Sequence, residues 1–411
     1  MSTSVCESGE LIPVDEAIER LLAQAPPPPS TQQVKTAQAL GRVLASDIFS
    51  PVNLPAWDNS AMDGYALCAA DLPAEGGYLR LAGRIAAGEG AATALSSGQT
   101  MRIFTGAPLP AGADTVVPQE RCRVYGQRIW CPPMRTGEHV RKQGEEVTQG
   151  ALLLPAGKRL RAQELGLLAA AGLAQVKVYR PLRVCLLSSG DELREPGDHL
   201  APGQIYNSNR HCLAALLQGW GVEVHDYGVM ADELAVSRDA LTLASSECDL
   251  LLTSGGVSVG EEDHLKQAIK ELGRVDFWRL AIQPGKPLAF GDVAGKPWIG
   301  LPGNPSAALI TALVVVRPFL LRAQGVTDVT PVPMLLPADF TWAQRNRRRQ
   351  YLRARLTPGI DGQARVTLHP RQSSAMLSAA CWADGLAIVD REQLVEKGGL
   401  VRFVSFAELM Q

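Results

Sequence analysis

The feature that most constrains the fold is a regular alternation of apolar and amphipathic segments between residues 181 and 327. The short apolar segments predict strands at residues 182–189, 222–229, 249–253, 275–282, 287–293 and 297–303. Segments with a helical period lie at residues 208–221 and 232–247, and Asn304 begins a further helix. Strands and helices that alternate in this way predict a parallel sheet covered by helices on both faces.

The strand at residues 249–253 ends in a loop, residues 254–260, that contains three glycines and two serines. Three carboxylates follow it, the last of which is Asp263. Loops at the carboxyl ends of parallel strands point backbone N–H groups at bound anions, and carboxylates such as Asp263 suit Mg²⁺. The loop therefore predicts a site for a phosphate-bearing anion beside a divalent cation. An ordinary strand–helix connection is the alternative. The loop matches neither a Walker motif nor a dinucleotide fingerprint.

Three further loops follow predicted strands of the same sheet and are expected at the same edge. Residues 188–192 (SSGDE) combine serine, glycine and carboxylates, although a plain turn is as good an explanation. The PGKP segment, residues 284–287, presents Lys286 as a cation for a phosphate. In the LPGNP segment, residues 301–305, Asn304 is a candidate helix N-cap, and that structural role alone would explain its identity.

The remaining sequence predicts three more domains, because the chain's 411 residues exceed what one core organises. Helical periods at residues 13–24 and 36–46, and again near residues 162–173, predict a helical N-terminal domain. Short alternating segments predict β structure on both sides of the α/β region. The predicted domains are a helical one (1–45 plus 140–180), an inserted small β domain (46–139), the α/β domain (181–327) and a C-terminal β-barrel (328–411).

Bulk properties predict a cytoplasmic protein that binds neither nucleic acid nor membranes. The formal net charge is −2, so no global field attracts polyanions. The most apolar segment, residues 306–316, is shorter than the roughly 20 residues of a membrane-spanning helix and predicts a buried helix. The N-terminus lacks a signal-peptide pattern. The eight cysteines form no C-x-x-C pair, which favours reduced thiols over a disulfide framework.

Two other motifs are ambiguous. Residues 58–66 (DNSAMDGYA) carry two carboxylates on a loop, and an Asx-turn explains them in isolation. Four arginines cluster at positions 345 and 347–349, where a solvated loop is the default and contact with a phosphate or a partner is the alternative. The six histidines show no metal-binding spacing.

Six motifs in this order closely resemble the molybdopterin molybdenumtransferase family, which includes the bacterial MoeA proteins and the E domain of gephyrin. They are DNSAMDGYA (58–66), RIFTGAPLP (102–110), SSGDEL (188–193), TSGGVSVGEED (253–263), WRLAIQPGKPLAFG (278–291) and GLPGNP (300–305). The resemblance implies an elongated four-domain homodimer. It also implies a reaction in which adenylylated molybdopterin and molybdate give the molybdenum cofactor and AMP, with Mg²⁺ present. The implied site lies between the third and fourth domains of one subunit and the second domain of the other.

The resemblance and the loop chemistry together give a set of candidate site residues. The expected catalytic residues are Asp63, Asp232, Asp263 and Lys286. The expected metal ligands are Asp263, Asp232 and Glu192. The expected substrate-binding residues are Thr105, Glu192, Ser254, Gly255, Gly256, Ser258, Arg279, Pro302, Pro305, Arg353 and Ser373. The further expected partners are the molybdopterin adenylyltransferase and proteins that mature molybdoenzymes.

The chain departs from the family pattern at three positions. Glu146 stands where the family usually has Asp, while Arg279 and Gln283 stand where it usually has lysines. Because Gln283 is neutral, it is left out of the candidate set. Two other functions are alternatives to the molybdenumtransferase hypothesis. A molybdopterin adenylyltransferase needs only the α/β domain, so residues 1–180 and 328–411 argue against it. A non-catalytic scaffold would need an extra domain or a long linker for attachment to a partner, and the sequence suggests neither.

Overall fold

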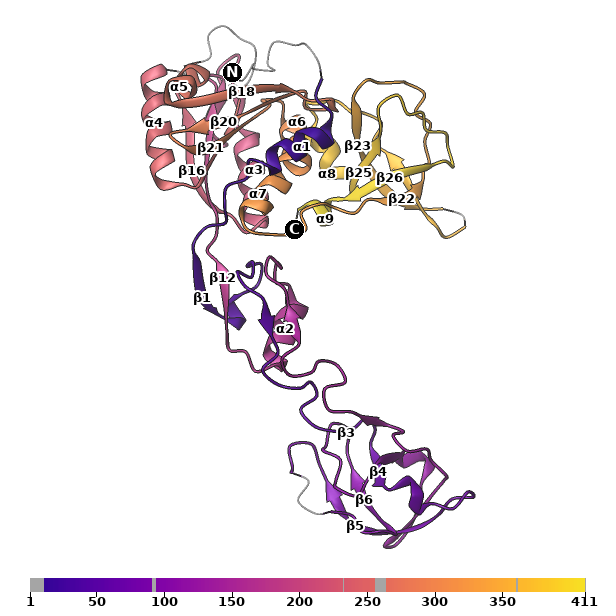
Figure 1. The fold of residues 1–411 in the computed structure, drawn as a ribbon. Helices are drawn as coiled ribbons and strands as arrows, with labels where there is room; N and C mark the ends of the chain where they lie inside the picture. Colours follow the sequence, from indigo (N-terminus) through magenta and orange to yellow (C-terminus); the bar gives the residue numbers. More distant parts are fainter. Residues whose placement is uncertain (1–10, 91–93, 232, 256–263, 360, 411) are drawn as a thin grey trace.

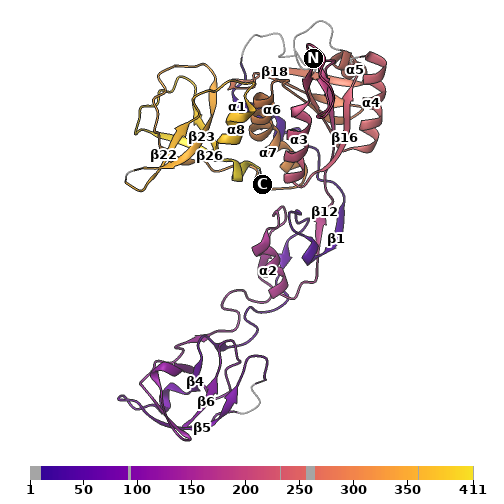
Figure 2. The same cartoon turned by 180° about the vertical axis from the view of Figure 1, so that it is seen from behind.

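The computed structural model shows an elongated molecule with three bodies in a row (Figures 1 and 2). The residues that it describes are 11–90, 94–231, 233–255, 264–359 and 361–410. A small β unit lies at one end, and a middle unit that carries α2 connects it to a larger body. The larger body combines the α/β unit with a C-terminal β unit, so that the described part of the chain both begins and ends in it.

The small β unit is a six-stranded sheet, in agreement with the short alternating segments of its sequence. Its strands, in the order β7-β4-β6-β5-β9-β8, are β4 (Gly64–Leu67), β5 (Gly77–Ile85), β6 (Gln99–Ile103), β7 (Thr115–Pro118), β8 (Arg123–Tyr125) and β9 (Arg128–Cys131). Beside the sheet, β3 (Asn59–Ser60) pairs with β10 (Val140–Arg141). Alternate residues of β4 face two different cores, since Ala66 packs in one and Tyr65 and Leu67 pack in the other.

The middle unit contains α2 (Ala162–Ala170) and two antiparallel strand pairs. These pairs are β1 (Thr31–Lys35) with β12 (Gln175–Tyr179), and β2 (Ile48–Phe49) with β11 (Leu152–Leu154). The helix predicted at residues 36–46 is wrong, because only a 3₁₀ turn, Thr36–Gln38, forms there. Gly41 has a φ of 73°, which a helix does not allow, and Leu44 instead bridges to Val178.

The predicted N-terminal helix forms as α1 (Val14–Leu22), but it lies in the larger body. Its apolar residues Val14, Ala17 and Leu21 are buried in the main core beside α7 (Arg317–Ala323). This placement differs from the predicted domain that joined residues 1–45 to residues 140–180. A helical period identifies an apolar face but does not say which core that face joins.

The α/β unit contains a six-stranded sheet in the order β16-β13-β17-β21-β20-β18. Its strands are β13 (Arg183–Ser189), β16 (Glu223–Met230), β17 (Leu250–Ser254), β18 (Gly273–Arg279), β20 (Pro287–Val293) and β21 (Lys296–Leu301). The first four strands in spatial order are parallel, as predicted, and β20 then pairs antiparallel to both of its neighbours. A hairpin connects β20 to β21, which explains the change of direction.

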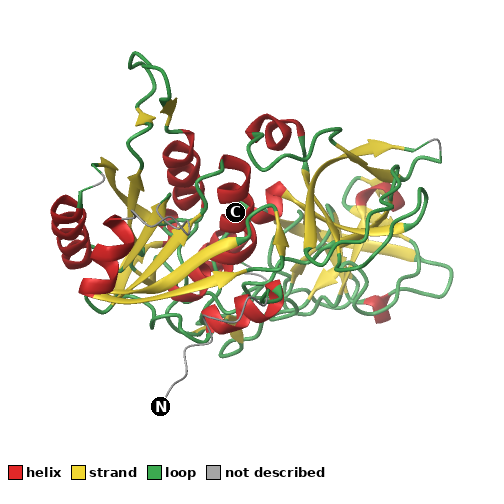
Figure 3. Ribbon diagram, turned by 90° about the horizontal axis from the view of Figure 1, so that it is seen from above, coloured by secondary structure: helices red, strands yellow, loops and turns green. Residues whose placement is uncertain are grey.

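Helices cover both faces of this sheet (Figure 3). They are α3 (Ser208–Gly219), α4 (Leu234–Glu247), α5 (His264–Leu272) and α6 (Pro305–Thr311), which continues through a π-helical turn, Ala312–Val316, into α7. The combined helix Pro305–Ala323 is long and apolar enough to cross a membrane, but 89% of its most apolar window is buried inside the protein. It is therefore a core helix, as expected from the sequence.

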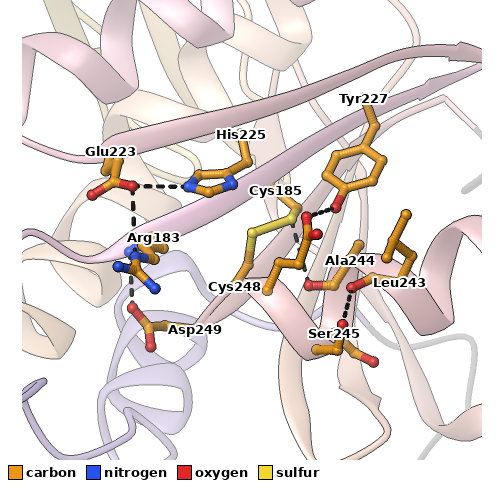
Figure 4. The surroundings of a disulfide bond; sticks show 12 residues. Arg183, Cys185, Glu223, His225, Tyr227, Leu243, Ala244, Ser245, Cys248 and Asp249 are labelled. Carbon is orange, nitrogen blue, oxygen red and sulfur yellow. Dashed lines mark hydrogen bonds and ion pairs between the residues drawn. A yellow bond between two sulfur atoms is a disulfide. The ribbon is translucent and has the colours of Figure 1, made fainter.

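A disulfide joins Cys185 of β13 to Cys248 at the end of α4 (Figure 4). For this pair the expectation of reduced thiols is wrong. The two cysteines are 63 residues apart, and they meet because α4 packs on the face of β13 that carries Cys185. Spacing along the sequence does not contain this information.

The C-terminal β unit is a curved sheet in the order β19-β23-β25-β26-β22, with β24 added beside β23. Its elements are β19 (Ile282–Gln283), β22 (Met334–Pro337), β23 (Arg349–Pro358), β24 (Ala364–Leu368), β25 (Gly385–Val389), β26 (Leu400–Ser405), α8 (Leu377–Trp382) and α9 (Phe406–Leu409). The unit shares the main core with the α/β unit through residues such as Tyr351 and Phe406. The indole of Trp220 also donates a 2.9 Å hydrogen bond to the carbonyl of Leu409. The two units therefore form one packed body.

Glu164 makes the stability of the middle unit depend on pH. Its side chain is buried at the start of α2 and accepts hydrogen bonds from the backbone N–H and the guanidinium of Arg161. The hydrogen bonds from the Arg161 side chain lower the pKa of Glu164 from 4.5 to about 2. A carboxylate whose pKa is lowered by folding stabilises the folded state at pH values above its unfolded-state pKa. This contribution to the free energy of unfolding is lost as the pH falls through the folded-state pKa.

We expect Glu164→Gln to lower the free energy of unfolding at pH 7 by about 1–2 kcal/mol, because a charged acceptor is lost. The difference from the wild type should shrink as the pH falls from 4.5 towards 2, where Glu164 itself becomes protonated. Urea unfolding at several pH values measures both effects. The control is Glu16→Gln, which removes an exposed ion pair with Arg20 and should cost less than about 0.5 kcal/mol. A pH-independent loss in the Glu164 variant would contradict the assignment.

Candidate active site

A cavity of 1210 Å³ lies between the carboxyl edge of the parallel strands and the C-terminal β unit. The ends of β13, β17 and β21 form one wall together with the start of α3. The rest of the cavity lining includes the segment between β19 and β20 and the loop at residues 372–375. This volume is above the roughly 300–1,000 Å³ that is usual for small-molecule sites. The position agrees with the ligand site expected for an open α/β sheet.

Several of the predicted site residues meet along this cavity although they come from five different loops. The predicted residues that line it are Glu192, Ser254, Gly255, Lys286, Pro302, Pro305 and Ser373. The Gly-Ser loop and the PGKP segment therefore converge on one space, as far as the described residues extend. Gly256, Ser258 and Asp263 lie outside the described residues, and so does Asp232.

Gly255 lets the first of these loops run close to its neighbour. Its φ is 89°, and a Cβ on this residue would lie 2.5 Å from the carbonyl oxygen of Ser189. Gly285 has a φ of 108°, and a Cβ there would lie 2.3 Å from the hydroxyl of Thr311. Any larger residue at either position would displace the backbone that lines the cavity.

Asn209, which the sequence analysis missed, holds two of the loops together. Its amide nitrogen donates 2.8 Å hydrogen bonds to the hydroxyl of Ser254 and to the carbonyl of Gly303. The residue is buried in the first turn of α3. Asparagine has a low helix propensity, so its presence just after the N-cap Asn207 was the one available signal.

The charged groups of the cavity differ in sign. Lys286 and Arg348 supply positive charge, and Glu192 supplies a carboxylate. In the described parts of the chain, neither cation forms an ion pair with a carboxylate, so their charges remain available to a ligand. Arg348 was noted in the sequence only as part of an arginine cluster.

Arg353 lies behind the cavity wall. It is fully buried on β23, and its Nη2 donates a 3.0 Å hydrogen bond to the carbonyl of Ser373. Its Nε and Nη1 have no hydrogen-bond partner among the residues that the structure describes. Burial lowers the pKa of Arg353 to about 10, which still leaves the side chain charged at neutral pH. A buried cation with unpaired donors therefore adjoins the loop that carries Ser373.

Besides Arg353, three predicted site residues lie away from the cavity lining. Asp63 and Thr105 adjoin β4 and β6 of the small β unit, and these strands lie at the end of the molecule remote from the α/β unit (Figure 1). The carboxylate of Asp63 accepts hydrogen bonds from the backbone N–H of Thr105 at 2.8 Å and from its hydroxyl at 2.7 Å. The backbone hydrogen bond from Thr105 is the main cause that lowers the pKa of Asp63. Arg279 ends β18 with an exposed side chain.

The predicted metal site is only partly visible. Glu192 is the single predicted ligand that the structure describes, and its carboxylate suits Mg²⁺. Among the residues that are described, no three His, Cys, Asp or Glu side chains come together as a metal site. Asp232 and Asp263 fall in the segments that are not described.

Comparisons with known proteins cover almost the whole chain. Residues 12–172 match the MoeA N-terminal region (domain I and II), residues 185–322 match a probable molybdopterin binding domain, and residues 336–406 match the MoeA C-terminal region (domain IV). A molybdopterin molybdenumtransferase from Haemophilus influenzae is 41% identical over 77% of this chain and 78% of its own length. One from Synechococcus elongatus is 35% identical over 92% and 95%, respectively.

Solved structures agree with these matches. A molybdopterin biosynthesis MoeA protein from Pyrococcus horikoshii is 32% identical, covers 97% of this chain and 99% of its own, and has a TM-score of 0.74. A second structure from that organism covers 97% and 100% with a TM-score of 0.81 at 26% identity. The three sequence regions in this order, together with relatives that extend over most of the chain, place it in the MoeA family.

Proposed function

We propose that this protein is a molybdopterin molybdenumtransferase, which inserts molybdate into adenylylated molybdopterin and releases AMP. The relatives that carry this name support the activity. The observation that carries the proposal is the convergence of Ser254, Gly255 and Lys286 on one cavity at the carboxyl edge of the sheet. Such an edge binds phosphates through backbone N–H groups and a nearby cation.

The chemistry requires a phosphoanhydride to break while molybdenum moves to the dithiolene of the pterin. We propose that an oxygen of molybdate attacks the phosphorus of AMP, that the P–O bond to the pterin phosphate breaks, and that the dithiolene sulfurs replace that oxygen on molybdenum. Lys286 would stabilise the negative charge that develops on the phosphate oxygens. Arg353, behind Ser373, would add positive potential near the oxyanion.

Magnesium belongs to the proposal as a cofactor. Glu192, Asp232 and Asp263 would hold it, and the ion would neutralise charge on the phosphates. What supports this assignment is the carboxylate of Glu192 in the cavity and the carboxylates that follow the Gly-Ser loop in the sequence.

We also propose a cytoplasmic homodimer. Large apolar side chains are exposed around the middle unit, as expected for an interface, and they include Leu40, Phe49, Trp57 and Leu152. A second copy would bring its Asp63 and Thr105 to the cavity, whose lining within one chain does not include these residues. The molybdopterin adenylyltransferase and molybdoenzyme-maturation proteins are proposed transient partners, whereas nucleic acid and membranes are not.

The direct test follows AMP when the purified protein is mixed with adenylylated molybdopterin, Mg²⁺ and molybdate. We expect Asp263→Asn to lower the rate of AMP release by at least about 100-fold, because a metal-binding carboxylate is lost. The melting temperature should not change. Asp239→Asn, on the exposed face of α4, is the matched control and should retain full activity. Retained activity in the Asp263 variant would contradict its assignment.

ATP consumption without molybdate would instead indicate an adenylyltransferase, and failure to bind pterin would favour a scaffold.

A further inference from the structure

The arginine cluster near the start of β23 divides into residues with different roles. Arg349 is neutralised, since it forms ion pairs with Asp15 of α1 at 2.6 Å and with Asp390 at 2.8 Å. Arg345 and Arg347 are exposed and do not line the cavity. Arg348 is half-buried and lines the cavity. The sequence favoured a solvated loop for all four arginines. This prediction fits Arg345 and Arg347 but not Arg348 and Arg349.

Arg348 contacts a neutral partner. Its Nη2 donates a 2.7 Å hydrogen bond to the side-chain oxygen of Gln283, which also accepts a 3.1 Å hydrogen bond from the amide of Asn346. A neutral amide orients a guanidinium without cancelling its charge. The hydrogen bond uses one of the five N–H donors of the guanidinium. Within the described residues, no carboxylate forms an ion pair with Arg348.

Gln283 connects Arg348 to the segment that carries Lys286. It is the last residue of β19, and only two residues separate it from Lys286. Gln283 also lines the cavity together with both cations. Two positive side chains thus line one cavity, and Gln283, which contacts Arg348, lies on the segment that carries Lys286. The planar fork of a guanidinium suits an oxyanion better than a single ammonium does.

We propose that Arg348 is a second oxyanion-binding cation of this cavity, and that the neutral side chain of Gln283 holds its guanidinium in position. The ligand is a tetrahedral dianion of the molybdate type, so the inference rests on the proposed function. It adds an anion contact from the C-terminal β unit to the one that Lys286 makes. Gln283 is then a positioning residue, since it acts through Arg348.

Titration calorimetry with sodium molybdate tests this role. We expect Arg348→Gln to weaken molybdate binding by about 10-fold or more, because a charge-assisted hydrogen bond is lost. Arg348→Lys keeps the charge but loses the planar fork, so its affinity should lie between that of Arg348→Gln and that of the wild type. Arg347→Gln removes a neighbouring, exposed charge and should bind as the wild type does. Melting temperatures of all three variants show whether each one is folded.

A double variant separates charge from architecture. In Gln283→Lys with Arg348→Gln, the positive charge returns to the same wall from the other side chain. Recovery of at least half of the lost affinity, on a logarithmic scale, would support a role through charge. No recovery would overturn that role and indicate a structural one. Unchanged binding in Arg348→Gln would overturn the inference and leave the proposed function intact, whereas a wild type that binds no molybdate would contradict both.

Discussion

Lys286→Gln is expected to lower kcat/KM for AMP release at least about 100-fold, the size of effect seen when a preorganised group that stabilises transition-state charge is removed. Lys286 lines the cavity, and no carboxylate in the described residues neutralises its ammonium group. Its backbone is already fixed, because its carbonyl accepts a 2.8 Å hydrogen bond from the N–H of Leu280. The variant should therefore keep its fold and lose only the charge.

Rates of AMP release at several molybdate concentrations measure this effect, and the melting temperature monitors the fold. Lys270→Gln, on the exposed end of α5, removes one positive charge from the same unit and should change the rate less than twofold. The comparison excludes a general effect of net charge. A Lys286 variant that keeps more than a third of the wild-type activity would contradict the placement of the ligand beside this loop.

The fold was predictable wherever a strong period determined it. Strands β13 and β17 are continuous apolar segments between turns, and α1 has a clear helical face. Each of these elements therefore forms at about the residues predicted for it. The middle unit was harder, because its strands are short and pair over long distances, as β1 and β12 do. Such pairing depends on tertiary contacts that local propensity does not encode. The partner of α1 and the Cys185–Cys248 disulfide were unpredictable for the same reason.

The site was predictable as a set of loops but not as a set of contacts. Glycines and polar residues at strand ends indicated the edge of the sheet, and the cavity lies there. Asn209 was missed because its partners, Ser254 and Gly303, come from distant strands. Arg348 was hidden among arginines whose partners the sequence does not reveal. A charge becomes informative only when it is known which neighbours neutralise it.

The burial of Arg353 leads to the second large expected effect, in which stability and activity change in opposite directions. We expect Arg353→Met to raise the free energy of unfolding by about 1–3 kcal/mol, since an apolar side chain of similar length replaces a buried cation. The guanidinium is fully buried, and its Nε and Nη1 have no hydrogen-bond partner in the described part of the chain. AMP release should nevertheless fall at least about 10-fold, because the potential behind Ser373 is lost. A protein retains such a costly group when its ligand uses it.

Urea unfolding and AMP release, measured on the same preparations, test this opposition. Arg355→Met is the matched control on the same strand, two residues away. Arg355 is satisfied, since it stacks on the ring of Trp382 at 4.1 Å and donates a 3.1 Å hydrogen bond to the carbonyl of that residue. Its replacement should therefore lower stability by about 1 kcal/mol, through the lost cation–π contact and hydrogen bond. If Arg353→Met also lowers stability by more than this amount, its guanidinium is a structural group, and the electrostatic role assigned to it behind the cavity is wrong.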